Sequence, residues 1–386
     1  MMKEFTFNLP VKIFFGEGIS RDLSDLARRY GASRVMLVTD RVIGKTKGFA
    51  AIEAGLKENG IQTVVYDETE PEPPVDAVDR AAAVMRESGC QMAVAVGGGS
   101  AIDSAKAMCM LCTNEGSVRE YLFGGNRTVE NRPLPLVCVP TTAGSGSEVT
   151  ASSVISDPER GIKLSITHEW LIPLAAVIDP VMHKDMPPVI TASTGMDALT
   201  HAIEAYVSRN AEPLSDALAL AAIRLIAEHI RTATYQPDCM EARSGMALAS
   251  VMAAASFVNA GLGAVHGISQ AMGGVAHVSH GIGNALLLPF VCEANLPGNM
   301  ERYARIAALL GEKTEGLPVH QAAGRCVEAI HRMLRELRLP AALHEVKVTR
   351  EMFPEIVKGG MAYRLMPLNP VPLKEEDIYS ILEKAF

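Results

Sequence analysis

The chain has 386 residues, a formal net charge of −8 and 48% hydrophobic residues. This length is enough for two domains of about 150 residues, each with a large core. The basic residues are scattered, whereas a nucleic-acid partner usually leaves a clustered basic patch, so we expect no such partner. No window reaches the ~20 apolar residues of a membrane span, and the N-terminus lacks the apolar run of a signal peptide. We therefore expect a cytoplasmic protein without a membrane partner.

The seven cysteines lie mostly in apolar runs, which is typical of small core residues in a reducing compartment rather than of a disulfide framework. They are Cys90, Cys109, Cys112, Cys138, Cys239, Cys292 and Cys326. Cys109 and Cys112 form a CxxC pair, but in a predicted helix flanked by Met and Leu. We interpret this pair as part of a core, not as a redox or zinc motif.

Strand and helix patterns alternate in the first half of the chain. Strands are predicted at 5–15, 34–39, 62–66, 91–96, 134–139 and 175–178, and helices at 23–30, 52–59 and 75–88. This alternation predicts a parallel sheet with helices on both faces, as in a Rossmann-like α/β domain.

Strand signals nearly vanish after Pro188. Helices are predicted at 191–208, 215–231, 240–259, 265–276, 284–295, 300–310, 320–337 and 375–386. The segment Met186–Pro188 interrupts the alternating pattern. We therefore predict an α/β domain over 1–187 and an all-α domain over 188–386.

A glycine-rich turn, Gly97–Asp103, follows the predicted strand at 91–96. Glycines let backbone N–H groups approach an anion, and a helix beginning at Ser100 would direct its positive end to the same place. Ser100 and Asp103 are expected to form a capping pair. The pattern favours a pyrophosphate site, although it is not GxGxxG and lies late for the first turn of a standard Rossmann unit. A tight turn without a ligand is the alternative.

A second loop, Pro140–Glu148, is dense in hydroxyls and glycines after another strand. It suits phosphate and ribose oxygens, and a surface turn is the alternative. Ligands of open α/β sheets bind at the carboxyl ends of strands, which favours two such loops acting together. Asp40 ends an earlier strand and could accept from ribose hydroxyls, favouring NAD over NADP, or could serve only as a turn residue. Lys163 could approach a phosphate or remain solvated.

The second half offers one carboxylate and three imidazoles. Asp197 and His201 lie four residues apart in a predicted helix and so share one face. His266 with His277 or His280 would complete an O/N/N/N set, which suits Fe or Zn better than Mg or Ca. Glycines are expected to break the helix near His280, so periodicity leaves the choice between the last two open, and a core histidine is the alternative for His201. The other six are expected at surface or capping positions: His168, His183, His229, His320, His331 and His344.

Over essentially its whole length the sequence resembles the iron-containing (group III) alcohol dehydrogenase family. The motifs that carry the resemblance are Ile13–Gly18, Gly97–Asp103, Pro140–Glu148, Gly195–Glu204, Gly263–His266 and His280–Ala285. The resemblance implies a dehydroquinate synthase-like fold: a dinucleotide-binding α/β domain, then a helical metal-binding domain, with the active site between them. It also implies a homodimer or a higher homo-oligomer.

The resemblance further implies roles for individual residues. It assigns the metal to Asp197, His201, His266 and His280, which leaves His277 without a ligand role. It assigns cofactor contacts to Asp40, Gly98, Gly99, Ser100, Thr141, Thr142, Ser145 and Lys163. Phe257 matches an aromatic position near the nicotinamide in some members.

The sequence departs from the family pattern at two positions. Gln270 stands where many members have a histidine that helps to relay the proton. Glutamine can hydrogen-bond but cannot titrate, so we expect the proton to pass through water, the ribose hydroxyls or His277. Gln270 and His277 are thus catalytic candidates beside the metal ligands. Glu72 stands where many members have Asn.

The expected function is hydride transfer between NAD(H) and a small primary alcohol or diol and its aldehyde. The metal, Fe(II) first and Zn(II) second, would act as a Lewis acid on the substrate oxygen. The alternatives are a polyol (glycerol-type) dehydrogenase and a maleylacetate reductase-like enzyme of the same superfamily. The intact ligand set disfavours the second, since that branch is metal-independent. A nucleotide-binding protein without activity is the least favoured interpretation.

Overall fold

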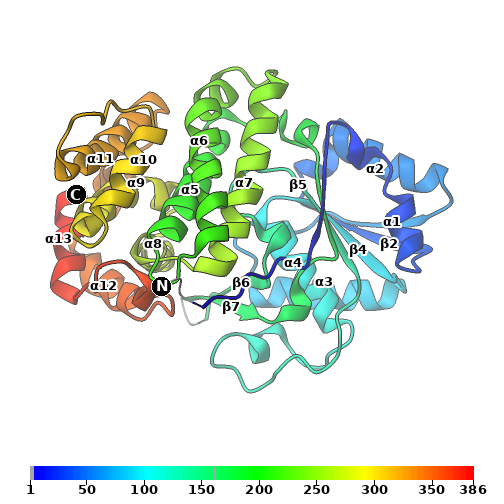
Figure 1. Ribbon diagram of the computed structural model, residues 1–386. Helices are drawn as coiled ribbons and strands as arrows, with labels where there is room; N and C mark the ends of the chain where they lie inside the picture. Colours follow the sequence, from blue (N-terminus) through cyan, green and yellow to red (C-terminus); the bar gives the residue numbers. More distant parts are fainter. Residues whose placement is uncertain (1–3, 160–161) are drawn as a thin grey trace. The chain divides into compact units, whose positions relative to one another are not determined.

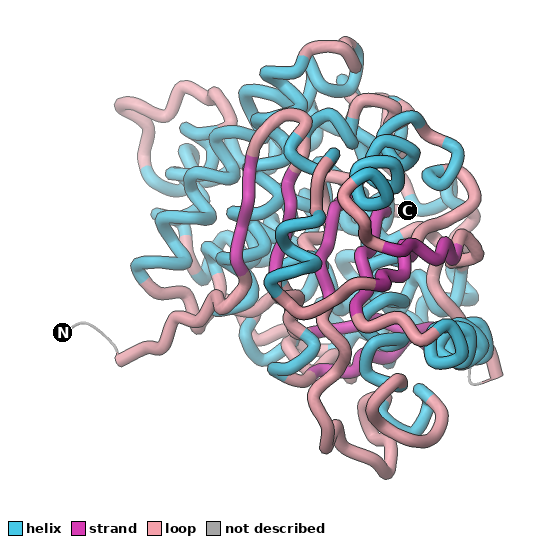
Figure 2. Tube along the Cα trace, turned by 90° about the vertical axis from the view of Figure 1, so that its right-hand side faces the viewer, coloured by secondary structure: helices cyan, strands magenta, loops and turns pink. Residues whose placement is uncertain are grey.

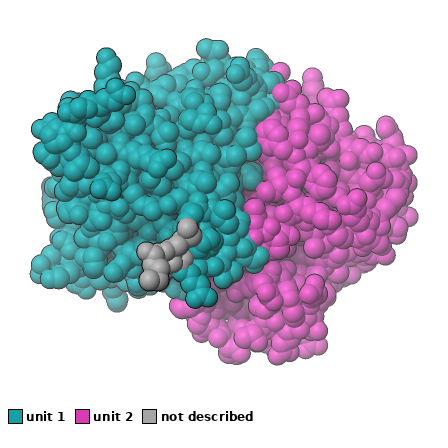
Figure 3. All heavy atoms as spheres, viewed as in Figure 1, with its two compact units in different colours: residues 1–8, 143–145, 186–386 teal, residues 9–142, 146–185 magenta. Residues whose placement is uncertain are grey.

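The computed structural model describes residues 4–159 and 162–386 (Figure 1). The chain forms two compact units, which are coloured separately in Figure 3. Unit 2 comprises Leu9–Thr142 and Gly146–Asp185. Unit 1 comprises Met186–Phe386, Ala143–Ser145 and the described residues up to Asn8. The domain boundary between 187 and 188 stays a prediction.

Unit 2 is built on a six-stranded parallel sheet in the order β1-β8-β5-β4-β2-β3 (Figure 2). Its strands are β1 (Lys12–Phe15), β2 (Arg34–Val38), β3 (Gln62–Tyr66), β4 (Met92–Gly97), β5 (Leu136–Pro140) and β8 (Ala175–Ile178). Every residue of β4, β5 and β8 is buried, as expected of central strands covered on both faces. The predicted parallel sheet is confirmed.

Helices cover both faces of this sheet: α1 (Ser24–Arg29), α2 (Lys47–Glu58), α3 (Val75–Ser88) and α4 (Gly99–Leu111). Successive strand residues point to opposite faces. In β2, Val35 and Leu37 therefore join the core that contains Ile52 of α2. Met36 and Val38 join the core that contains residues of α3 and α4. The α/β prediction is confirmed, since each hydrophobic strand feeds two cores.

Two features of unit 2 differ from the prediction. The strand expected over 5–15 forms only at Lys12–Phe15. Pro10 has no N–H to donate to a sheet, which explains why pairing begins after it. An antiparallel hairpin of β6 (Ser152–Asp157) and β7 (Ile162–Thr167) was not expected. Its strands are rich in Ser, Thr and charged residues, so they lack the apolar runs that identified the others.

Unit 1 from residue 188 onward is helical. Its α-helices are α5 (Pro188–Val207), α6 (Pro213–Tyr235), α7 (Met240–Ala260), α8 (Ala264–Ala276), α9 (His280–Asn295), α10 (Met300–Leu309), α11 (Val319–Glu336), α12 (Phe353–Met361) and α13 (Glu375–Ala385). α5, α6 and α7 lie side by side (Figure 1). Buried alanines are frequent in their shared core, and small side chains let helices approach closely. The predicted helical second half is confirmed, with α12 as an additional helix.

The glycines around His280 do not act as helix breakers. The interruption lies at residues 277–279, and α9 begins at His280 and contains Gly281 and Gly283. A Cβ at Gly281 would lie 2.8 Å from the Ser193 carbonyl oxygen, and one at Gly283 would lie 2.6 Å from the Ser269 hydroxyl. These glycines therefore allow close helix packing. The expected break near His280 is present at residues 277–279, but Gly281 and Gly283 do not cause it.

All seven cysteines are free thiols. Cys109 is buried in α4, and burial raises the pKa of its thiol well above the usual value. Burial also raises the pKa of Cys112 to about 11. Cys109 belongs to a hydrophobic core and Cys112 packs against that core, so the interpretation of this CxxC pair as part of a core is confirmed.

Within residues 4–159 and 162–386, no single helix is long and apolar enough to cross a membrane. α7 and α8 reach the criterion only when they are taken together, and a bend of 102° separates them.

Candidate metal centre and nucleotide site

Three helices of unit 1 bring one carboxylate and three imidazoles together. Asp197 and His201 lie on successive turns of α5, His266 lies in the first turn of α8, and His280 begins α9. Their ligand atoms all lie within 4.8 Å of one another. The Oδ1 atom of Asp197 is 3.9 Å from the Nε2 atoms of His201 and His266, and 3.7 Å from that of His280. His277 is not a member of this group.

Close packing fixes the helix that carries two of these residues. Gly195 lies two residues before Asp197, and a Cβ there would lie 2.8 Å from atoms of both Ile230 and Met246. These neighbours belong to α6 and α7. A larger residue at 195 would require the ends of these two side chains to move, so the glycine of this motif has a packing role.

The group is buried on one side and accessible on the other. Asp197, His201 and His266 are each 4% exposed, whereas the side chain of His280 is 46% exposed. Burial lowers the pKa of His201 to about 3, so this imidazole is neutral near pH 7. Burial alone would raise the pKa of Asp197, but the three imidazoles and a side-chain hydrogen bond offset it, and the pKa is lowered. A neutral imidazole and an ionised carboxylate are the forms that bind a divalent metal.

A buried carboxylate, Glu204, orients one of the imidazoles. Its Oε2 atom lies 2.5 Å from Nδ1 of His266, and its Oε1 atom accepts from the Val265 amide at 2.7 Å. A proton on Nδ1 leaves the Nε2 lone pair directed at the group, which is the usual carboxylate–histidine–metal arrangement. Glu204 was not among the predicted site residues, although its spacing of three and seven residues from His201 and Asp197 places it on their helix face.

A buried amide, Asn284, lies directly against the group. Its Nδ2 atom is 2.7 Å from Oδ1 of Asp197 and 3.1 Å from Nε2 of both His266 and His280. Asn284 follows His280 by one helical turn on α9. That spacing could have identified it, but a lone asparagine is a weak signal in a sequence.

Three further candidates lie on helices of unit 1. The ring of Phe257, on α7, stacks on that of His201 with centroids 4.5 Å apart and planes at 29°. Gln270 follows His266 by one turn on α8 and is partly buried. His277 is exposed and ends α8 with a φ of 55°, a left-handed conformation that is uncommon for residues other than glycine.

In unit 2, two loops meet at the carboxyl ends of β4 and β5. The strands are neighbours, with Gly97 paired to Pro140, and the Thr141 amide donates to the Gly97 carbonyl at 3.0 Å. A Cβ at Gly98 would lie 3.3 Å from the Thr142 side chain. The glycine thus permits this close approach. The amino end of α4 lies beside the loop Pro140–Glu148, hereafter the hydroxyl loop, as expected of an anion site.

The expected capping pair of Ser100 and Asp103 is wrong. α4 begins at Gly99, so its N-cap is a glycine and Ser100 already lies inside the helix. The Ser100 hydroxyl accepts from the Glu72 amide at 3.2 Å. The Asp103 carboxylate accepts from the Val154 amide at 3.0 Å and so supports the hairpin. Both side chains bond elsewhere, and the helix starts one residue earlier than the pattern suggested.

Asp40 and Lys163 both have partners within unit 2. Oδ1 of Asp40 accepts from the amides of Val42 and Ile43 at 2.7 and 2.9 Å, so the turn role left open by the sequence is present. Nζ of Lys163, on β7, lies 2.5 Å from Oε1 of Glu72. Lys163 is therefore not simply a solvated lysine, and its partner is the residue that departs from the family pattern.

A buried lysine, Lys106, bonds to the end of the hydroxyl loop and to the residues that follow it. Nζ of Lys106 donates to the Ser147 and Thr150 hydroxyls at 3.0 Å and to the Ser152 carbonyl at 2.7 Å. Glu148 is also buried, and burial raises the pKa of its carboxyl to about 7. This network gives the loop a defined shape behind Thr141 and Thr142.

The hydroxyl loop also contributes to the helical unit, because its segment Ala143–Ser145 belongs to unit 1. A Cβ at Gly144 would lie 2.6 Å from the Thr194 carbonyl oxygen of α5. Ser145 therefore lies in a segment held against α5, whereas Thr141 and Thr142 lie with the sheet.

Two of the histidines that were expected at surface or capping positions differ in the structure. The His168 side chain accepts from the Trp170 amide at 3.2 Å and caps a short 3-10 helix, as predicted. His183 is 1% exposed, and its Nε2 atom lies 3.0 Å from the Pro140 carbonyl oxygen. The expected surface or capping position of His183 was therefore wrong. Its polar sequence context does not reveal that this residue packs against the end of β5.

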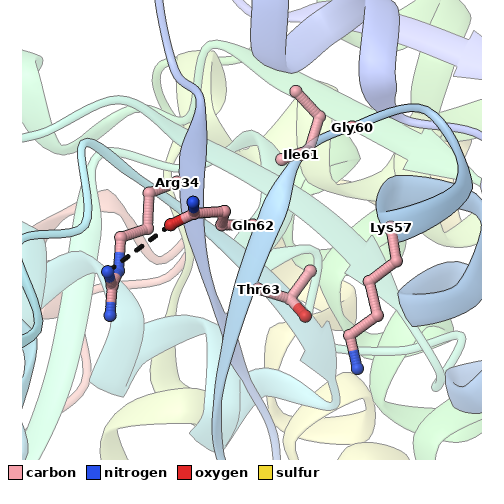
Figure 4. A pocket seen from close by; sticks show the side chains of 6 residues that line it. All are labelled: Arg34, Lys57, Gly60, Ile61, Gln62 and Thr63. Atoms are coloured by element: carbon pink, nitrogen blue, oxygen red, sulfur yellow. Dashed lines mark hydrogen bonds between the residues drawn. The ribbon is translucent and has the colours of Figure 1, made fainter.

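Unit 2 has a hollow at the opposite end of its strands (Figure 4). The hollow is lined by Arg34, Lys57, Gly60, Ile61, Gln62 and Thr63. Arg34 and Gln62 are the first residues of β2 and β3. The hollow therefore lies at the amino ends of these strands, away from the loops described above.

Comparisons with known proteins match almost the whole chain. Residues 10–180 match the family "Iron-containing alcohol dehydrogenase", and residues 191–386 match "Fe-containing alcohol dehydrogenase family, C-terminal". Long-chain-alcohol dehydrogenase 1 of Geobacillus thermodenitrificans is 38% identical and covers 96% of this chain and 94% of its own. NAD-dependent methanol dehydrogenase of Bacillus methanolicus is 35% identical, and the match covers 98% of this chain and 99% of that protein. The crystal structure of a 1,3-propanediol oxidoreductase is similar, with a TM-score of 0.96, 36% identity and 100% of both chains covered.

Proposed function

Since the chain belongs to the iron-containing alcohol dehydrogenase family and is an NAD-dependent oxidoreductase of that family, we propose that four side chains hold its metal: Asp197, His201, His266 and His280. The observation that carries the proposal is their convergence, with one carboxylate oxygen and three imidazole nitrogens within 4.8 Å. This donor set fits Fe(II) and Zn(II), and the family favours Fe(II). The reaction is hydride transfer between NAD(H) and a small alcohol or diol and the corresponding aldehyde.

The residues around the proposed centre have separate tasks. When bound, the metal supplies Lewis acidity at the substrate oxygen and the nicotinamide supplies the hydride. Glu204 keeps the proton on Nδ1 of His266. Phe257 restrains the His201 ring by stacking on it. The exposed side of His280 leaves a path for the substrate.

The proton that accompanies the hydride needs a route of its own. Gln270 cannot titrate, so we propose that it orients water or a hydroxyl by hydrogen bonding. We propose that His277, which is exposed, passes the proton to solvent.

We propose that NAD(H) binds at the carboxyl ends of β2, β4 and β5. The contacts proposed are Asp40, Gly98, Gly99, Ser100, Thr141, Thr142, Ser145 and Lys163. The support is the amino end of α4 beside the hydroxyl loop, since free amides and the helix dipole stabilise phosphate there. The carboxylate of Asp40 would repel the 2′-phosphate of NADP, which favours NAD.

A single assay tests the proposed metal role. The protein is depleted of metal, reloaded with Fe(II) or Zn(II), and mixed with NADH and a panel of short aldehydes while NADH absorbance is followed. Activity should return only with metal, and His266→Ala should lose metal retention and activity together. His229→Ala, a partly buried histidine of α6, is the matched control and should keep both. Full turnover by metal-free protein would refute the proposal.

The same assay, run in the oxidation direction with NAD, distinguishes the substrate alternatives. Short primary alcohols and 1,3-diols should be oxidised faster than glycerol if the protein is an alcohol dehydrogenase. Preference for glycerol would favour the polyol dehydrogenase. In the reductive direction, with NADH, reduction of maleylacetate without metal would favour the other branch of the superfamily.

We propose that the protein is a homodimer that pairs through β1. This strand lies at an edge of the sheet, and Ile13, Phe14 and Phe15 are 39%, 38% and 43% exposed. An apolar edge strand is a template for pairing with a second chain. Sedimentation equilibrium should give a dimer for the wild-type protein and a monomer for Phe15→Lys. An unchanged mass for that variant would exclude β1 as the interface.

We also propose a cytoplasmic location. All seven cysteines are free thiols, and several lie within apolar cores. Such thiols are typical of proteins in a reducing compartment. Fractionation of cells that make the tagged protein should recover it with cytoplasmic enzymes, and recovery outside the cytoplasm would contradict the proposal.

A further inference from the structure

The loop between α12 and α13, residues 363–371, packs against the start of α8. Three glycines face this loop: Gly261, Gly263 and Gly267. A Cβ at the first would lie 2.4 Å from Cδ1 of Leu368, and one at the second would lie 2.8 Å from Oδ1 of Asn369. One at the third would lie 3.1 Å from the side chains of Tyr363 and Met366. The loop is therefore in direct contact with the chain that leads into α8.

Asn369 uses both ends of its side-chain amide in this contact. Its Oδ1 atom accepts from the Ala264 amide at 3.2 Å and from Nδ2 of Asn295 at 3.0 Å. Its Nδ2 atom donates to Oδ1 of Asn295 at 2.7 Å and to the Val371 carbonyl oxygen at 2.8 Å. An amide oxygen has two lone pairs and an amide nitrogen has two hydrogens, so this side chain is fully bonded. Asn369 is also buried, and a buried amide with four partners is held in one orientation.

α8 begins without a capping side chain of its own, because its N-cap is Gly263. The first amides of a helix have no acceptor within the helix. At α8 the Ala264 amide is bonded by Asn369, and the Val265 amide is bonded by Oε1 of Glu204 at 2.7 Å. Both acceptors come from outside the helix, so tertiary contacts decide where α8 starts.

His266, the proposed ligand on α8, directly follows these two amides. Its Nδ1 atom lies 2.5 Å from Oε2 of Glu204. Glu204 therefore orients the imidazole, whereas Asn369 holds the backbone two residues earlier. Loss of the bond from Asn369 would let the first turn of α8 shift and carry the His266 ring away from the other ligands.

The loop bonds to each of the three chain segments that carry proposed ligands. The Leu368 carbonyl oxygen accepts from the Arg209 amide, two residues beyond α5, at 2.9 Å. Asn369 bonds to Ala264 of α8 and to Asn295, the last residue of α9. The loop itself contains no His, Cys, Asp or Glu. It can therefore act on a metal by holding the ligand-bearing helices in place.

We infer that residues 363–371 position the proposed metal ligands, and that Asn369 is the positioning residue for His266. The inference rests on the proposed metal centre and extends it to a part of the chain about a hundred residues further on. Loss of a group that supports a metal ligand typically lowers metal affinity 10–100-fold. Asn369 acts through the backbone rather than on the imidazole, so we expect a smaller effect, of at least about threefold.

Zn(II) alone is the probe, and its dissociation constant is measured by chelator competition in the wild type, Asn369→Ala and Asn295→Ala. Asn114→Ala is the matched control. Asn114 is a buried amide of unit 2 that also bonds at both ends, to the Met110 and Asn131 carbonyl oxygens and to the Glu130 amide. For each metal-free variant the free energy of unfolding is measured with urea, and hydrogen exchange of amides 264–267 is followed by mass spectrometry. NADH affinity is measured by fluorescence titration.

Asn369→Ala should bind Zn(II) at least threefold more weakly, and its amides 264–267 should exchange faster, while NADH affinity is unchanged. Asn295→Ala removes two of the four bonds of Asn369 and leaves the bond to Ala264, so its Zn(II) affinity should lie between those of Asn369→Ala and the wild type. Asn114→Ala should lose unfolding free energy but bind Zn(II) as the wild type does. Stability and metal affinity would then be separate, as a positioning role requires.

Three results would overturn the inference. The first is a Zn(II) affinity in Asn369→Ala that differs less than threefold from that of the wild type, which indicates a structural role only. The second is equal weakening in Asn114→Ala, which indicates a general effect of lost stability. The third applies if Asn369→Ala does not fold, and is wild-type Zn(II) affinity in Asn295→Ala. Failure of the metal proposal itself is distinct: the wild-type protein would then bind no Zn(II), or His266→Ala would bind it equally well.

Discussion

The hydrogen bond between Glu204 and His266 gives the sharpest prediction for the metal centre. Two donors face the two oxygens of Glu204: the Val265 amide at 2.7 Å and Nδ1 of His266 at 2.5 Å. In Glu204→Gln one oxygen becomes an NH₂ group, which must face one of these donors. The backbone amide cannot change, but the imidazole can. Its proton therefore moves to Nε2, the atom that should bind the metal.

The size of the effect follows from this change of tautomer. Loss of a carboxylate partner typically lowers metal affinity 10–100-fold, or about 1.4–2.7 kcal/mol. Glu204→Ala removes the orientation but leaves the imidazole free to choose its tautomer, so we expect about tenfold. Glu204→Gln must also break a buried hydrogen bond to return the proton, which costs a further 1–3 kcal/mol or so. We expect about 100-fold or more for Glu204→Gln.

Zn(II) affinity is measured by chelator competition, and ¹⁵N NMR of the metal-free protein reports which nitrogen of His266 is protonated. Glu212→Gln is the matched control. Glu212 is a buried carboxylate of the same unit that accepts from the Leu214 and Ser215 amides at 2.8 and 2.6 Å, away from the imidazoles. Its affinity should be that of the wild type. Glu204→Gln binding more tightly than Glu204→Ala would refute the reasoning.

Three other predictions concern pH and the cofactor. Burial raises the pKa of Glu148 to about 7 from 4.5, so between these values the folded protein holds a proton that the unfolded chain has released. The free energy of unfolding, measured with urea, should fall as pH rises through this range, by about 3 kcal/mol at most. Glu148→Gln should remove this fall. An equal pH dependence of the unfolding free energy in the wild type and Glu148→Gln would contradict the prediction. Glu72→Asn removes a negative charge and releases Lys163, so NADH should bind several-fold more tightly by fluorescence titration, and weaker binding would exclude a phosphate role for Lys163. Gln270→His should sharpen the pH dependence of the rate near neutrality, because an imidazole can titrate there, and an unchanged profile would exclude position 270 from the proton route.

The sheet of unit 2 was predictable because burial on both faces leaves a plain signal. β4 and β8 are continuous apolar runs, and only strands covered on both sides tolerate them. β6 and β7 pack one face of a small hairpin, and their composition resembles that of loops. Their pairing depends on the support of Asp103 and Lys106 from α4, which no local pattern reveals.

The ligand group was predictable only in part. Asp197 and His201 share a helix, so their spacing alone placed them together. His266 and His280 come from other helices, and local periodicity could not choose His280 over His277. Glu204 and Asn284 were missed because their roles depend on which atoms face them across helices. Such contacts are set by tertiary packing and not by spacing along the chain.

The exposed imidazole of His280 has a practical consequence for the isolated protein. If the four proposed ligands hold an ion, three buried side chains and one ring that is 46% exposed surround it, so it could leave or enter on the His280 side without unfolding of the helices. Its occupancy would follow the supply of metals in the growth medium and the purification buffers. The metal content of a preparation would therefore record its history, and activities from different laboratories are comparable only after the ion has been replaced under defined conditions.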